Sequence, residues 1–133
     1  RYVILIAESC ATTRRIKEII LRAEGHDLQI ASDHEEAADL AMSKRPDLIL
    51  LGLEMPRRGS IELLRELKNS PMTADVPVIA ITTADDETGR QEAKESHCDG
   101  FLSKPFEAGE LLLKVAAHLR PGTPSRRGDT FGR

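Results

Sequence analysis

The chain has 133 residues, of which 40% are hydrophobic and 31% are charged, and its formal net charge is −3. This composition is typical of one soluble globular domain, and the acidic balance with few aromatic residues argues against a surface that binds nucleic acid. No apolar run approaches the roughly 20 residues that span a bilayer, and Cys10 and Cys98 have neither metal-site spacing nor the number for a disulfide framework. We therefore expect a cytoplasmic protein with no direct contact to nucleic acid or membrane.

Short apolar runs alternate with helical patterns along the chain. The predicted strands are residues 2–7, 28–31, 48–51, 76–81 and 100–103. Three of these runs are apolar almost throughout, which indicates strands covered by helices on both faces, as in a parallel sheet.

A segment with helical spacing follows each predicted strand. The segments are marked by Ile16, Ile19, Ile20 and Ala23; by Ala37, Leu40 and Ala41; by Ile61, Leu64 and Leu67; by a cap at Thr83 and Asp86; and by Leu112, Val115, Ala116 and Leu119. The alternation predicts an α/β fold, a (βα)5 doubly wound five-stranded parallel sheet of the flavodoxin-like type. In such a fold the loops after the strands meet at one edge and form the site.

Polar side chains and one glycine stand at the ends of the predicted strands. Glu8 and Ser9 follow the first strand, Gly52 closes the third, Thr82 follows the fourth and Lys104 follows the fifth. Because the carboxyl ends of parallel strands share one edge of the sheet, the ends of the first, third and fifth strands are expected to converge on one crevice.

The sequence around these strand ends resembles the receiver domain of bacterial two-component response regulators, the CheY-like family. The matching stretches are residues 4–8, 46–51, 54–56, 77–82 and 98–106. The last stretch, with Thr82 at 22 residues before Lys104, is the most specific. The resemblance covers about residues 2–119 and implies the receiver fold. We expect residues 1–120 to form this domain and residues 121–133, rich in Pro, Gly, Ser and Arg, to be a flexible tail or linker.

The resemblance also assigns roles to individual positions. Receivers of this family take a phosphoryl group from a histidine kinase onto an Asp at the end of the third strand, and acidic residues after the first strand help that Asp hold Mg²⁺. A Thr or Ser and a Lys bind the phosphoryl oxygens, and an aromatic residue on the fifth strand reports the change. In this chain Thr82, Lys104 and Phe101 match these positions, and Glu8 matches one of the two acidic positions.

Two positions depart from the family pattern. Ser9 stands at the second acidic position, and Gly52, which has no atom that could carry a phosphoryl group, stands at the phosphoacceptor position. Glu8 is then the only remaining candidate metal ligand, and one carboxylate makes a poor Mg²⁺ site, so we expect weak or absent Mg²⁺ binding and no cofactor. Lys104 has one plausible partner in the crevice, which predicts a direct or water-bridged Glu8–Lys104 pair. Glu54 is not expected to replace the missing acceptor.

These departures favour a degenerate pseudo-receiver, a phosphorylation-independent domain that is not an enzyme and acts through protein–protein interaction. Its expected partners are signalling proteins, other domains of the same polypeptide, or a second copy of the chain in a homodimer. The resemblance implies an output face on the fourth helix, fifth strand and fifth helix, where Phe101, Lys94 and Glu95 would meet the partner.

Two alternatives remain open from the sequence. One is a conventional phosphoacceptor receiver whose Asp has been substituted in this chain, and the residue at position 52 in the natural gene distinguishes it from a pseudo-receiver. The other is a flavin-binding or small-ligand domain on the same architecture. That domain needs a phosphate-binding loop after the first strand, whereas residues 8–13 contain no glycine and begin with a carboxylate.

Overall fold

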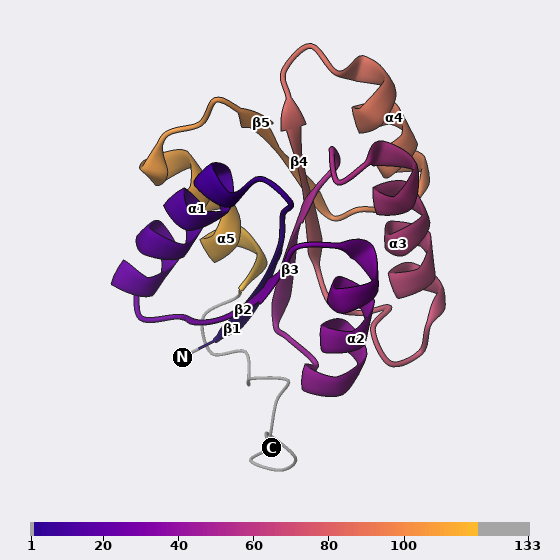
Figure 1. Ribbon diagram of the computed structural model, residues 1–133, viewed down its shortest axis with the longest axis horizontal. Coiled ribbons are helices and arrows are strands. Elements are labelled where there is room, and N and C mark those ends of the chain that lie inside the picture. Colours follow the sequence, from indigo (N-terminus) through magenta and orange to yellow (C-terminus); the bar gives the residue numbers. More distant parts are fainter. Residues whose placement is uncertain (1, 120–133) are drawn as a thin grey trace.

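The protein, described over residues 2–119 by a computed structural model, is a five-stranded parallel sheet between two layers of helices (Figure 1). The strands are β1 (Val3–Ala7), β2 (Asp27–Ala31), β3 (Leu48–Gly52), β4 (Val78–Thr83) and β5 (Gly100–Lys104). The helices are α1 (Ala11–Ala23), α2 (His34–Lys44), α3 (Arg57–Asn69), α4 (Glu87–Glu95) and α5 (Ala108–His118). The strand order is β2-β1-β3-β4-β5, so the predicted (βα)5 doubly wound sheet is confirmed. The tail predicted at residues 121–133 lies outside the described residues.

Both faces of the sheet are buried, which explains the apolar runs in the sequence. Every residue of β1 and β3 is buried. Leu5 and Ile49 point into a core shared with α2, α3 and α4, whereas Ile4 and Leu50 point into a second core shared with α1 and α5. Figure 1 shows the same division, with α1 and α5 on one side of the sheet and the other three helices on the opposite side.

The buried face of α1 differs from the apolar spacing that predicted the helix. Ile16 and Ile19 are 47% and 59% exposed, whereas Lys17 and Leu21 are buried. The spacing of the apolar residues did not mark the buried face of the helix, because Lys17 is part of that face. A lysine has a long aliphatic stem and is buried when its ammonium has a partner.

The buried stripe of α5 also differs from the prediction. Leu111, Val115 and Leu119 face the core at a spacing of four residues, whereas Ala116 is exposed and Leu112 is only half-buried. The prediction is confirmed for Val115 and Leu119 and was wrong for Leu112 and Ala116. Leu111 and Leu112 are both apolar, and each has helical spacing to Val115. The sequence of the helix therefore does not show which of the two leucines faces the core.

The ends of β4 and β5 lie further along the chain than the sequence predicted. β4 ends at Thr83 and β5 ends at Lys104, so Thr82 and Lys104 belong to the strands and do not follow them. The cap of α4 is Asp86 alone, whose side chain accepts the Gly89 N–H, and not Thr83 with Asp86 three residues on.

Candidate functional site

The crevice lies at the carboxyl ends of β1 and β3, two neighbouring strands of the sheet. Gly52 is the last residue of β3, and Glu8 directly follows β1 and is buried. A Cβ atom at position 52 would lie 3.2 Å from Glu8 Oε1 and 3.4 Å from the Ala7 carbonyl oxygen. Ser9, the other residue predicted here, is exposed. The Glu8 carboxylate therefore lies directly against position 52.

A buried lysine that the sequence analysis did not identify pairs with Glu8. Lys17 Nζ, from α1, lies 2.5 Å from Glu8 Oε1, and the Glu8 and Lys17 side chains are 5% and 1% exposed. The other carboxylate oxygen of Glu8 accepts the Cys10 N–H at 3.3 Å. Burial by itself raises the pKa of the Glu8 carboxyl, but the Lys17 hydrogen bond and charge, with the charge of Lys104, bring it below the ordinary value of 4.5. Glu8 is therefore ionised at neutral pH.

Lys104 has two carboxylates near its ammonium. Lys104 Nζ lies 4.0 Å from Glu8 Oε1 and 3.2 Å from Glu54 Oε1. The predicted Glu8–Lys104 ion pair is thus present, at the long limit of such contacts. The expectation that Glu8 is the one partner of Lys104 was wrong, because Glu54, just beyond the end of β3, comes closer.

The Thr82 hydroxyl is bound to the cap of α4. It donates a hydrogen bond to Asp86 Oδ2 at 2.7 Å, and Asp86 Oδ1 accepts the Gly89 N–H at 3.0 Å. Arg57, the first residue of α3, forms an ion pair with the same carboxylate. Burial favours the protonated form, but these hydrogen bonds and the Arg57 charge hold the Asp86 pKa below its ordinary value of 3.8.

The D86N variant is expected to cost about 1 kcal/mol of unfolding free energy at neutral pH, because asparagine still caps α4 but forms no ion pair with Arg57. The Asp86 pKa is lower in the folded state than in the unfolded state, so the contribution of Asp86 is complete above pH 3.8 and is lost as the pH falls below that value. Denaturant unfolding of the unaltered chain and of D86N, from neutral pH to below pH 3.8, should show the difference between their free energies of unfolding decrease. A difference that stays constant with pH would contradict this origin.

Two residues of the site were missed by sequence reasoning, Lys17 and Arg57. Both are cations whose carboxylate partners, Glu8 and Asp86, lie at the ends of other elements. A signal for Lys17 was present, since it stands four residues before the buried Leu21 on the face of α1 that meets the sheet.

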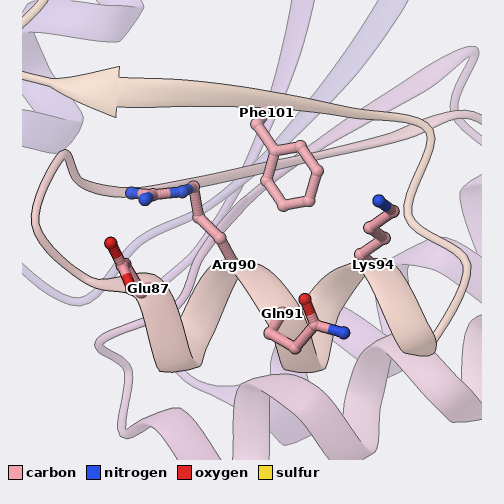
Figure 2. Close-up of a pocket in the computed structure, with 5 residues that line it drawn as sticks. All are labelled: Glu87, Arg90, Gln91, Lys94 and Phe101. Carbon is pink, nitrogen blue, oxygen red and sulfur yellow. The ribbon is translucent and has the colours of Figure 1, made fainter.

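Phe101 lies where β5 faces α4, beside a shallow pocket of about 380 Å³. The pocket is lined by Glu87, Arg90, Gln91, Lys94 and Phe101. Figure 2 shows the Phe101 ring pointing from β5 toward α4, with the Arg90 and Lys94 side chains on either side of it. Glu95, the third residue predicted for this face, is exposed and accepts a hydrogen bond from the Gln91 amide. The structure thus brings Phe101 and Lys94 to one pocket and leaves Glu95 outside its lining.

Within residues 2–119, no group of three or more His, Cys, Asp or Glu side chains is placed to hold a metal ion. In the same part of the chain, no helix has the length and apolar character needed to cross a membrane. At the crevice, the one buried carboxylate, Glu8, is engaged by an ammonium. The donor set around Gly52 therefore does not fit a divalent cation, which requires several oxygen ligands.

The sequence profile of the response regulator receiver domain family matches residues 4–116, and the chain belongs to this family. It is therefore a receiver domain of two-component signalling. It is 32% identical over 121 residues to the phosphate regulon transcriptional regulatory protein PhoB of Pseudomonas aeruginosa. This match covers 91% of this chain and 53% of PhoB. It is 33% identical over 121 residues to the response regulator MprA of Mycolicibacterium vanbaalenii. This match covers 91% of this chain and 52% of MprA.

Among solved structures, the signal receiver domain of a signal transduction histidine kinase from Syntrophus aciditrophicus superimposes with a TM-score of 0.84. The two chains are 27% identical, and the superposition covers 100% of each. The chain spans about half the length of the two curated relatives.

Proposed function

We propose that this receiver domain works without phosphorylation, through contacts with signalling proteins or with other domains of its own polypeptide. The observation that carries the proposal is Gly52 at the end of β3, in the position of the phosphoacceptor. Glycine has no side-chain atom that can form a bond to phosphorus. The space that an acceptor side chain would enter is bounded by Glu8 Oε1 at 3.2 Å.

The remaining residues of the site support the same proposal through their contacts. Lys104 and Thr82 correspond to the family's phosphoryl-binding positions, and both have protein partners: Lys104 pairs with Glu54, and Thr82 donates to Asp86. Glu8, the only carboxylate left from the metal-binding positions, pairs with Lys17. We therefore expect weak or absent Mg²⁺ binding and no bound cofactor.

The proposed contact surface is the pocket between α4 and β5. Phe101 supplies an apolar face, and Arg90 and Lys94 supply positive charge beside it. α4 buries only Gly89 and Ala93, so few apolar contacts hold it against the rest of the domain. Such a helix can be repositioned by a partner at low cost, which suits a surface that communicates by binding.

A conventional phosphoacceptor receiver, with its Asp substituted in this chain, is the second candidate. Thr82 and Lys104 are compatible with it, because they match the positions that bind the phosphoryl oxygens in the family. Ser9 counts against it, because a single substitution at position 52 would leave the acidic pair after β1 intact.

Amide NMR titration of the chain with Mg²⁺ and then with beryllofluoride, a mimic of the bound phosphoryl group, tests the proposal. We expect no saturable shift at residues 8, 52, 82 and 104, because the acceptor and one of the two acidic residues are missing and Glu8 is paired with Lys17. A receiver that has the acceptor Asp, titrated in the same way, is the positive control. A saturable change that spreads from the crevice to Phe101 would contradict the proposal.

A further inference from the structure

We infer that the ammonium of Lys17 occupies the crevice in place of a divalent cation, so that Mg²⁺ is excluded by an internal charge as well as by the missing acceptor. The inference rests on the proposed function, because it explains how the same crevice is kept neutral without metal. It predicts that restoring the acidic residues is not enough to restore a metal site.

The geometry centres on one oxygen atom, Glu8 Oε1. This atom lies 2.5 Å from Lys17 Nζ, 4.0 Å from Lys104 Nζ, and 3.2 Å from the place that a Cβ at position 52 would take. A Mg²⁺ ion bound to the same oxygen would sit about 2.0–2.1 Å from it. The ammonium and the metal ion would therefore compete for the same carboxylate.

The charges around this oxygen exclude a second cation. The Glu8 carboxylate is already neutralised by Lys17, and Lys104, which also pairs with Glu54, places a second ammonium 4.0 Å from the same oxygen. A divalent ion bound to Glu8 would lie within a few ångströms of the ammonium, and the repulsion between them is strong because Lys17 and Glu8 are almost inaccessible to water.

Lys17 is not free to swing aside into solvent. Its side chain is 1% exposed, and it shares the buried face of α1 with Leu21. Leaving the crevice would require Lys17 to move its ammonium past packed residues and would leave the buried Glu8 carboxylate with only the more distant Lys104 ammonium, 4.0 Å away. Lys17 is thus a fixed part of the crevice.

The test compares Mg²⁺ affinity in the S9D/G52D variant with and without K17M, by calorimetry and by amide NMR. S9D and G52D return the missing carboxylates, and K17M removes the ammonium while keeping an apolar stem of similar length. We expect K17M to raise the Mg²⁺ affinity about tenfold or more, because it removes a full charge beside the ion. R15M, which removes an exposed positive charge from the same helix, is the control and should leave the affinity nearly unchanged. Equal affinities with and without K17M would overturn the inference.

A second measurement covers the case in which K17M impairs folding. The side-chain methylene next to Lys17 Nζ is followed by NMR while S9D/G52D, with Lys17 in place, is titrated with Mg²⁺. Failure to bind, or binding that moves this methylene signal as the ammonium leaves Glu8, supports the inference. Saturable binding at the crevice with the Lys17 signal unmoved overturns it. Both experiments use the S9D/G52D variant, whereas the proposed function is tested on the unaltered chain. A response of the unaltered chain to beryllofluoride would therefore refute the proposed function and leave the effect of Lys17 on Mg²⁺ affinity to be measured separately.

Discussion

Replacing Lys17 with methionine in the unaltered chain is expected to lower the free energy of unfolding by about 3–5 kcal/mol. The variant removes the near partner of a buried ion pair and leaves the Glu8 carboxylate with only the Lys104 ammonium at 4.0 Å, and breaking a buried pair by removing one partner is strongly destabilising. Both side chains are almost inaccessible to water, so solvent does not replace the lost contact. Denaturant unfolding at neutral pH measures the effect directly.

The double variant E8Q/K17M is the matched control for this prediction. It removes both charges, and replacing a whole buried pair by neutral residues is often nearly neutral, so it should recover most of the loss. R15M should change the stability by no more than about 0.5 kcal/mol, because the Arg15 side chain is 73% exposed. A K17M variant as stable as the unaltered chain would show that the Glu8 contact is not made in solution.

The second large effect is expected at α5. Leu111→Ala should cost about 2–5 kcal/mol, because Leu111 is completely buried in the core beneath the sheet and its truncation leaves a cavity. Leu113→Ala is the control on the same helix, since Leu113 is 74% exposed, and it should stay within about 0.5 kcal/mol of the unaltered chain. Thermal or denaturant unfolding of the two variants measures this difference in stability.

The comparison with Leu112→Ala tests the register of this helix. The sequence placed Leu112, Val115, Ala116 and Leu119 on the buried stripe; the structure buries Val115 and Leu119, but it buries Leu111 where the sequence placed Leu112. A larger loss from Leu112→Ala than from Leu111→Ala would favour the sequence-based register and contradict the packing described above.

The sheet could be predicted because its physical requirements leave strong marks in the sequence. Strands covered on both faces must be apolar almost throughout, as residues 48–51 are, and parallel strands need a helical crossover between them. The right-handed crossover then places the ends of β1, β3 and β5 at one edge. The positions of Glu8, Gly52 and Lys104 around the crevice followed from these rules.

The partners of the side chains could not be predicted in the same way. The Lys17–Glu8 pair depends on how α1 is rotated about its axis, and the exposed Ile16 and Ile19 suggested a different rotation. The Arg57–Asp86 pair joins residues 29 positions apart, on helices whose separation is set by packing of the whole layer. Neither rotation nor separation is fixed by the local pattern of apolar residues.

The shared carboxylate of Asp86 has a mechanical consequence. It joins the end of β4, the start of α4 and the start of α3 through Thr82, Gly89 and Arg57. Releasing the Thr82 hydroxyl breaks a hydrogen bond to a charged group, at about 1.5–3 kcal/mol, so the released form makes up at most about a tenth of the molecules. A partner that displaces α4 therefore also acts on Arg57, and through α3 on the loop between Gly52 and Arg57. This one side chain thus links the proposed contact surface to the crevice.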